Sequence, residues 1–174
     1  MNKTLHVFAA ALVVFSFTAC KKTTTKPPAP GGETHATTTT DTTGATSSGK
    51  LGPADLDRDP CLRQRVVYFD YDKSDIKSEA ASILACHGRY LRDNPNARMT
   101  LEGHCDERGT REYNLGLGER RGNAASQGLQ GNGGGSAQLN VVSYGEERPT
   151  CTESNEGCWS KNRRVEIVYT AKGG

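Results

Sequence analysis

The sequence predicts an α+β domain in which helices pack on one small mixed sheet, with the element order β-α-β-α-β-β. Three observations support this prediction: short β-branched and aromatic runs, longer segments with apolar residues at helical spacing, and the alternation of the two along the chain. Residues 55–174 carry these patterns, and their number suits one globular domain of ~100–150 residues. The rest of the 174-residue chain is therefore expected to be appended to that domain.

Each element follows from a local signal. The expected strands lie at 66–69, 98–102, 139–143 and 165–169. The first helix can be capped by Ser74 or Asp75 and stops near Asn94-Pro95. Its apolar positions are Ile76, Ala80, Ile83, Leu84 and Leu91. The hydroxyl of Thr110 can cap a second helix that begins around Arg111.

The expected topology brings two loops together. A β-α-β unit normally makes a right-handed crossover, so the first two strands should run parallel. The loops that follow them, Asp70–Lys73 and Gly103–Gly109, then open at the same end of the sheet. Ligands of such sheets favour the end where strands finish and helix N-termini point outward. Asp72 and Asp106 are thus expected to lie near each other.

Residues 1–19 have the features of a bacterial lipoprotein signal peptide. Lys3 supplies positive charge, an apolar run follows, and Ala19 precedes Cys20. The run falls short of the ~20 residues that a membrane-spanning helix needs, so we expect cleavage, with Cys20 as the lipidated first residue. Phe17 departs from the usual lipobox, and an ordinary secretory signal with an incidental cysteine is the alternative. In both cases the chain leaves the cytoplasm.

Residues 20–54 are predicted to be the lipidated cysteine followed by a disordered tether. The segment is rich in Thr, Pro and Gly and almost free of aliphatic and aromatic side chains. It cannot bury enough apolar surface to offset the entropy of ordering. Such a tether would let a membrane-anchored domain reach a target outside the membrane.

Six cysteines in an exported chain must be divided between lipid, disulfides and free thiols. Cys151 and Cys158 enclose a short polar loop and are the best disulfide candidates. Cys61, Cys86 and Cys105 then form an odd set, so at least one of them stays free or pairs elsewhere.

A zinc site built from Cys86-His87 and His104-Cys105 is the alternative use of these cysteines. Adjacent residues of a helix or a strand point in different directions, so neither dipeptide readily offers both side chains to one metal. The sequence therefore favours no metal, and it indicates no cofactor.

Three charged residues can form a ligand site where the two loops meet. Arg121 lies at the edge of the apolar stripe of the second helix, and its planar fork of donors suits a carboxylate. Asp106 lies just before that helix, whose free N–H groups favour an anion. With Asp72, these groups suit a zwitterion, whose ammonium would meet the aspartates. The alternatives are an internal salt bridge for Arg121 and a local backbone contact for Asp106.

Five motifs support a more specific prediction. They are VYFDYDKSDI at 67–76, LEGHCDERGTREYN at 101–114, LGERR at 117–121, VSYGEERP at 142–149 and WSKNRRVE at 159–166. Together they resemble the peptidoglycan-associated lipoprotein (Pal) family over about residues 66–169. Several long motifs in the right order are far more specific than one short pattern.

The resemblance implies an OmpA-like domain that binds the meso-diaminopimelate side chain of the peptidoglycan stem peptide. In the family, an aspartate and an arginine fifteen residues later hold the free zwitterionic end of that side chain, and they correspond to Asp106 and Arg121. Asp72 contributes from the first loop, which Tyr71 also lines, and Arg108 is a further candidate from the second. Three other motif residues are assigned to structure rather than to ligand: His104, Asn162 and Arg163.

The resemblance also implies a place in the cell envelope. It predicts a lipid anchor in the outer membrane, with the domain facing the periplasm. It further implies membership of the Tol–Pal system of envelope integrity and cell division, with a TolB-like periplasmic protein as partner. The residue chemistry gives no independent sign of that partner.

Glycines mark a departure from the family. The segment 128–135 contains five glycines where the family continues a helix, and Gly116 and Gly122 stand where alanine is usual. An interior glycine costs a helix ~0.5–1 kcal/mol relative to alanine. The helix that carries Arg121, above all its C-terminal half, is therefore expected to be less stable than is typical of the family.

The main alternative function is a cell-wall enzyme that uses a carboxylate pair from Asp72, Asp106 and Glu107. A glycosidase needs one carboxyl group with a raised pKa. A neighbouring arginine has the opposite effect, because it favours the ionised carboxylate. The sequence therefore favours a non-catalytic binding module. A net charge of +2 is too small to indicate nucleic acid as a partner.

Overall fold

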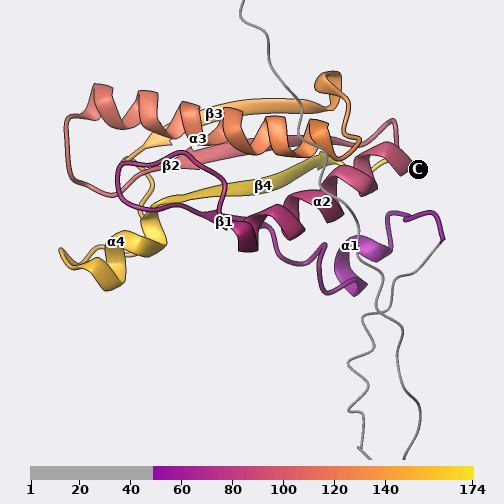
Figure 1. Ribbon diagram of the computed structural model, residues 1–174, viewed down its shortest axis with the longest axis horizontal. Coiled ribbons are helices and arrows are strands. Elements are labelled where there is room, and N and C mark those ends of the chain that lie inside the picture. Colours follow the sequence, from indigo (N-terminus) through magenta and orange to yellow (C-terminus); the bar gives the residue numbers. More distant parts are fainter. Residues whose placement is uncertain (1–48) are drawn as a thin grey trace, which may run out of the picture. The chain divides into compact units, whose positions relative to one another are not determined.

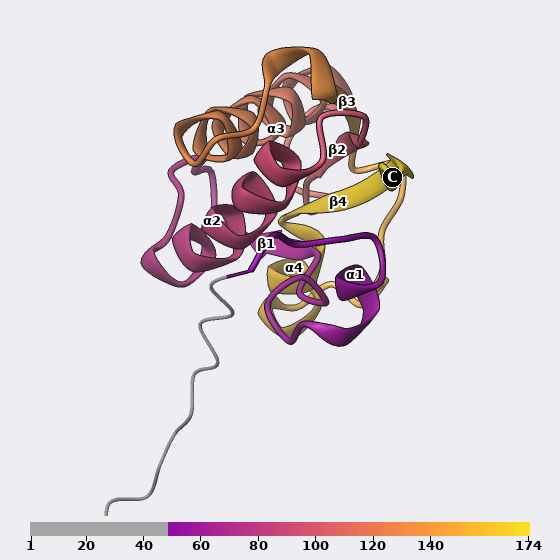
Figure 2. The same cartoon turned by 90° about the vertical axis from the view of Figure 1, so that its right-hand side faces the viewer.

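Strands and long helices alternate along the computed structural model, which describes residues 49–174 (Figure 1). The elements in chain order are α1 (Asp55–Arg58), β1 (Val66–Tyr68), α2 (Ser78–Asp93), β2 (Arg98–His104), α3 (Arg111–Gly131), the 3-10 helix η1 (Ser136–Gln138), β3 (Leu139–Gly145), α4 (Glu156–Asn162) and β4 (Arg164–Ala171). Helices α2 and α3 lie side by side on one face of the sheet (Figure 2). The predicted fold, helices on one small mixed sheet, is confirmed.

The last strand lies inside the sheet, whose order is β1-β4-β2-β3. Strand β4 is antiparallel to both β1 and β2, and β2 is parallel to β3. Strands β1 and β2 therefore run in the same direction, as the crossover rule predicted, although β4 separates them. The loops that follow β1 and β2 open at one end of the sheet, on the left in Figure 1.

The core forms between the sheet and the two long helices because alternate strand residues face the helices. The buried strand residues are Val67, Met99, Leu101, Val165 and Ile167, and they pack against Leu84, Leu91, Ala125 and Leu129 of the helices. Burying a side chain of this kind contributes ~1.5–3 kcal/mol relative to leaving it exposed. This core fixes the two strand ends that carry the loops.

The sequence suggested that the folded part starts at residue 55, but it begins earlier. Leu51 is buried in the core, and its N–H donates to Asp93 at 3.1 Å. The predicted signal peptide, Cys20 and most of the predicted tether lie outside the described residues. Within 49–174, no helix combines the length and the hydrophobicity that a membrane crossing requires.

Two expectations about helices need correction. Helix α2 begins at Ser78, after an extended Lys77, and not next to Ser74 or Asp75. The chain first makes a turn in which the N–H of Lys73 donates to the carbonyl of Asp70, so the helix starts later. The short helices α1 and α4 were not expected. The predicted Thr110 cap is confirmed, because its Oγ1 accepts from the N–H of Tyr113 at 3.2 Å.

The glycines of α3 do not end the helix, which continues to Gly131. Three of them face neighbours that leave no room for a side chain. A Cβ on Gly118 would lie 2.3 Å from Oγ of Ser143, and one on Gly122 would lie 2.5 Å from Cγ1 of Val141. On Gly128 the nearest atom, from α2, would be 2.7 Å away. The C-terminal half of this helix is therefore formed, and its glycines pack closely against strands and α2. Its lower stability stays a prediction.

Candidate functional site

The loops after β1 and β2, with the start of α3, enclose a pocket of about 120 Å³. Its lining residues are Tyr71, Asp72, Cys105, Asp106, Arg108, Gly109, Tyr113, Asn114, Leu117, Arg121 and Arg163. All five ligand contacts predicted from the sequence are among them: Asp72, Asp106, Arg121, Tyr71 and Arg108. A larger hollow of about 630 Å³ lies over α2 and α3, and none of the five lines it.

Asp106 is the buried anion of the pocket, with only 4% of its surface exposed. Arg108 contacts both oxygens of its carboxylate, through Nε at 3.1 Å and Nη2 at 2.7 Å. Arg163 adds a donor at 3.2 Å. Burial alone would raise the pKa of Asp106, but the hydrogen bonds from Arg108 and Arg163 outweigh burial and lower that pKa. Asp106 is therefore ionised at neutral pH.

Arg108 covers Asp106 from the solvent side. Its guanidinium lies between two aromatic rings, 4.0 Å from the ring centre of Tyr71 and 4.1 Å from that of Trp159. Such cation–π contacts hold an arginine over an aromatic face while its edge stays free to donate. The three side chains form a stack at the mouth of the pocket, and Tyr71 is 55% exposed.

Asp72 lies exposed at the same mouth, and its backbone has a left-handed φ of 55°. The hydroxyl of Tyr113 donates to its carboxylate and joins the first loop to α3. A left-handed backbone is uncommon for a residue other than glycine, although aspartate tolerates it better than most. The turn aims the carboxylate of Asp72 across the pocket toward the helix.

Arg121 is completely buried and binds backbone rather than a carboxylate. Its Nε donates to the carbonyl of Lys73 at 2.8 Å, and Nη2 donates to that of Asp70 at 3.1 Å. Nη1 donates to the carbonyl of His104 at 2.9 Å and contacts Sγ of Cys105 at 3.4 Å. Within residues 49–174 the salt bridge weighed for Arg121 is thus not formed. The guanidinium instead fastens both loops to α3 at the base of the pocket.

The second loop is also fastened by Asn114, in the first turns of α3. Its Nδ2 donates to the carbonyls of Asp106 at 3.3 Å and Arg108 at 3.2 Å. Cys105 is the free cysteine of the described part of the chain, and burial raises the pKa of its thiol to about 11. At neutral pH this thiol is protonated, so it lacks the thiolate that a nucleophile needs.

Arg163 lines the pocket, although its motif predicted a structural role. Besides contacting Asp106, it donates from Nε to the carbonyl of Phe69 at 3.1 Å and from Nη2 to Glu156. The motif around it gave a signal, but not the direction of its side chain. The structural assignment of Asn162 is confirmed, because its Oδ1 accepts from the N–H groups of Thr150 and Cys151 at 2.9 and 3.1 Å.

Four of the cysteines form two disulfides. Cys151 pairs with Cys158, as the sequence predicted, and Cys61 pairs with Cys86. Among residues 49–174, Cys105 is the cysteine left without a disulfide. Because Cys86 is oxidised, it cannot supply a thiolate to the zinc site that the sequence raised as an alternative.

The pocket therefore combines opposite charges in a small space. Two carboxylates (Asp72, Asp106) and three guanidinium groups (Arg108, Arg121, Arg163) line it. This arrangement suits a ligand that carries both an ammonium and a carboxylate group. It offers no activated nucleophile among the lining residues.

Comparisons with known proteins agree with this architecture. The model of the OmpA family matches residues 68–163. The chain is 54% identical over 100 residues to a peptidoglycan-associated lipoprotein of Pseudomonas putida, a match that covers 58% of this chain and 60% of that protein. It is 43% identical over 125 residues to the one of Haemophilus influenzae, covering 72% and 79%.

A solved structure gives the same result. The crystal structure of the peptidoglycan-associated lipoprotein from Burkholderia pseudomallei superposes with a TM-score of 0.64 and 38% sequence identity. The superposition covers 67% of this chain and 98% of that one. The matched region of the Pseudomonas putida protein, by contrast, is only about three fifths of its length.

Proposed function

The chain belongs to the OmpA family and, within it, to the peptidoglycan-associated lipoproteins, and we propose that it binds peptidoglycan without a covalent link and tethers the outer membrane to it. One observation supports this most: the five predicted contacts, from two loops and a helix, line one pocket of mixed charge. The domain would face the periplasm, held by a lipid on Cys20.

The proposed ligand is the meso-diaminopimelate side chain of the stem peptide. Its free end carries an ammonium and a carboxylate, which matches the charges of the pocket. The ammonium would meet the exposed carboxylate of Asp72 first and then that of Asp106. Arg108 forms an ion pair with Asp106 at 2.7 Å. The ligand ammonium would therefore compete with Arg108, whose freed guanidinium can turn to the ligand carboxylate.

Arg121 would meet the ligand carboxylate from below. A guanidinium has five N–H donors, and the contacts with Lys73, Asp70, His104 and Cys105 account for four of them. The remaining donor is available at the base of the pocket. Arg121 thus has two tasks in this proposal: it holds the loops in position and contributes one charge-assisted hydrogen bond.

A catalytic role is the alternative, and the electrostatics do not favour it. A general acid among the carboxylates would need a raised pKa. Arg108 and Arg163 instead lower the pKa of Asp106, and hydrogen bonds from Ser154 and Trp159 lower that of Glu107. We therefore propose a binding module and not an enzyme.

Membership of the family also suggests protein partners. We include in the proposal a place in the Tol–Pal system of envelope integrity and cell division, with a TolB-like periplasmic protein as partner. This part of the proposal depends on the family alone, and no contact within residues 49–174 bears on it.

The test is calorimetric titration of the full chain with two soluble stem peptides. One carries meso-diaminopimelate, and the other carries L-lysine at the same position and so lacks the second carboxylate. A hydrogen bond to a charged group contributes ~1.5–3 kcal/mol, and 1.4 kcal/mol corresponds to a tenfold change in affinity. We expect the lysine peptide to bind at least about tenfold more weakly.

The same titration is repeated with Asp72→Asn and Asp106→Asn, with Glu119→Gln as the matched control. Glu119 is exposed on α3 and does not line the pocket. Both aspartate variants should lose at least about tenfold in affinity, and the control should match the parent. Equal affinity for the two peptides, or unchanged binding by both aspartate variants, would contradict the proposed site.

A further inference from the structure

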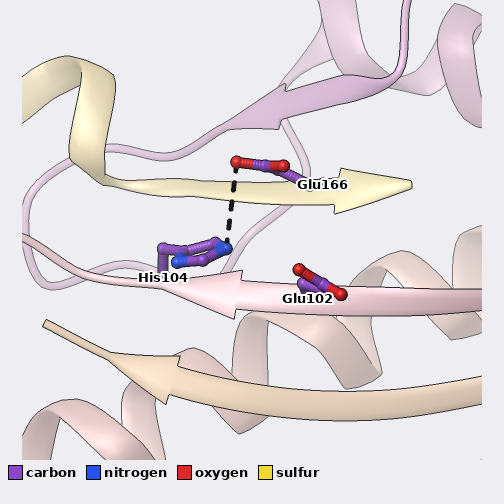
Figure 3. A group of neighbouring side chains, drawn as sticks. All are labelled: Glu102, His104 and Glu166. Atoms are coloured by element: carbon purple, nitrogen blue, oxygen red, sulfur yellow. Dashed lines mark ion pairs between the residues drawn. The ribbon is translucent and has the colours of Figure 1, made fainter. Parts of the chain in front are cut away.

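Glu102, His104 and Glu166 gather on the sheet face that α2 and α3 leave uncovered (Figure 3). Glu102 and His104 come from β2, and Glu166 comes from the neighbouring strand β4. Along β2, Glu102 and His104 alternate with Leu101, which is in the core, and with Gly103, whose backbone touches α3. We propose that these three residues bind a divalent transition-metal ion, with Zn²⁺ as the best chemical match.

The donor set supports this class of ion. One ligand atom from each residue lies within 4.8 Å of the others. Zinc takes imidazole nitrogen and carboxylate oxygen at ~2.0–2.2 Å, which puts tetrahedral ligands ~3.4 Å apart. The two glutamate side chains would have to rotate to bring their oxygens to this separation. Both glutamates are only half-buried, so water could complete the coordination from the solvent side.

The buried, unpaired imidazole of His104 independently indicates a ligand. Only 2% of its surface is exposed, and among residues 49–174 neither ring nitrogen has a hydrogen-bond partner. A buried polar group without a partner is costly and rare in native proteins. Nε2 of this ring points toward Oε1 of Glu166, 3.9 Å away. A metal ion bound to this ring and to the carboxylate of Glu166 would give the nitrogen its missing partner.

The other buried histidine of the domain shows the contrast. His87 is also completely buried, but both of its ring nitrogens are engaged. Nδ1 lies 2.7 Å from the hydroxyl of Tyr169, and Nε2 lies 2.9 Å from the carbonyl of Gln64. His87 thus behaves as a satisfied core residue, and His104 does not.

The pairing of the glutamates gives a second reason. Glu102 and Glu166 are directly opposite each other in the antiparallel register of β2 and β4. Like charges at such positions repel, and a cation between them would remove the repulsion. Arg164 already contacts Glu166, but both of its contacts, at 2.7 and 2.6 Å, reach Oε1. Oε2 of Glu166 and the carboxylate of Glu102 remain for a metal.

The three proposed ligands lie on two strands that pair directly with each other. Bound metal would join β2 to β4 at the base of the loop that carries Asp106.

The test is titration of the full chain, without a polyhistidine tag and after chelation with EDTA, with Zn²⁺ in a calorimeter. We expect one ion per chain at this site and a melting temperature several degrees higher with excess zinc. Changes beyond the direct ligands already cost 10–100-fold in metal affinity. Glu102→Gln, Glu166→Gln and His104→Gln should therefore each weaken binding by roughly 100-fold.

Glu119→Gln is the matched control. Glu119 lies on α3, away from the cluster, so this variant should bind zinc as the parent does. Because the chain has four histidines, imidazole nitrogen NMR signals identify the ligand, and the resonances of His104 should shift when zinc is added. If His104→Gln does not fold, the half-exposed Glu102 still decides the question. No zinc binding at millimolar concentration, parent-like binding by Glu102→Gln, or shifts at other histidines alone would overturn the proposal.

Discussion

Gly103 of β2 and Gly118 of α3 touch through their backbones: a Cβ on Gly103 would lie 2.0 Å from the carbonyl oxygen of Gly118. A strand and a helix can approach this closely only where both lack side chains. The contact lies directly before the loop that carries Asp106. The glycines of α3, which composition alone marks as a weakness, thus let the helix present Arg121 to the two loops.

The first prediction compares two alanine substitutions on the same helix. At Gly116 an added Cβ would meet only the flexible end of Arg120, at 3.4 Å, so Gly116→Ala should stabilise the domain by about 0.5–1 kcal/mol. Gly118→Ala gains the same propensity but meets Ser143 at 2.3 Å, and overpacking typically costs ~1–3 kcal/mol. We expect a net loss of about 1–2 kcal/mol in urea unfolding. Equal effects of the two substitutions would show that the close contact is not required.

The positions of the two loops that line the pocket could be predicted because they depend on a general rule. A right-handed crossover makes β1 and β2 run in the same direction, whatever lies between them. The insertion of β4 between them could not be predicted, since strand order depends on side-chain packing across the whole sheet. The same holds for Arg163, which follows α4 and reaches Asp106 from 57 residues away in the sequence.

The contacts of Arg121 could not be predicted from helix geometry alone. Helix geometry put Arg121 at the edge of the apolar stripe, whereas it lies completely buried, within the buried face of α3. Helix geometry also could not say which acceptors the guanidinium would meet. Those acceptors are the carbonyls of Lys73, Asp70 and His104, from segments whose ends depend on turn geometry. The late start of α2 has the same origin, because the turn between Asp70 and Lys73 comes before the helix.

The second prediction follows from those contacts. Arg121→Lys replaces a planar fork with one ammonium, which cannot reach all three carbonyls at once. Buried acceptors left without a donor cost ~1–3 kcal/mol each, so the domain should lose on the order of 2–4 kcal/mol. Arg120→Lys is the matched control, because Arg120 is exposed and should tolerate the change. Urea unfolding of both variants checks this, and equal stability would contradict the proposed fastening role of Arg121.

The third prediction concerns the relative strength of the disulfides. Cys61 and Cys86 are 25 residues apart, whereas Cys151 and Cys158 are 7 apart. A longer closed loop removes more entropy from the unfolded chain, by roughly 3–4 kcal/mol for the first and roughly 2 kcal/mol for the second. The double serine variant of the first pair should thus unfold at lower urea than that of the second. The reverse order would mean that native contacts, and not loop entropy, dominate.

The fourth prediction is a pH dependence that His87 imposes on stability. A carbonyl can only accept, so Nε2 carries the proton donated to Gln64, and Nδ1 accepts from the hydroxyl of Tyr169. This arrangement requires the neutral ring. Burial lowers the pKa of His87 below its ordinary value, although the hydrogen bond to Gln64 acts in the opposite direction.

The sign follows from proton uptake. As the pH falls below about 6.5, the unfolded chain binds a proton at this histidine before the folded protein does, so the free energy of unfolding decreases. The decrease continues until the pH reaches the lowered pKa of the folded state. His87→Gln has no such proton to bind, so its stability should change less between pH 7.5 and 5 than that of the parent. Urea unfolding at a series of pH values, with EDTA present, measures the difference. Identical slopes for the two proteins would mean that His87 is not held neutral by its surroundings.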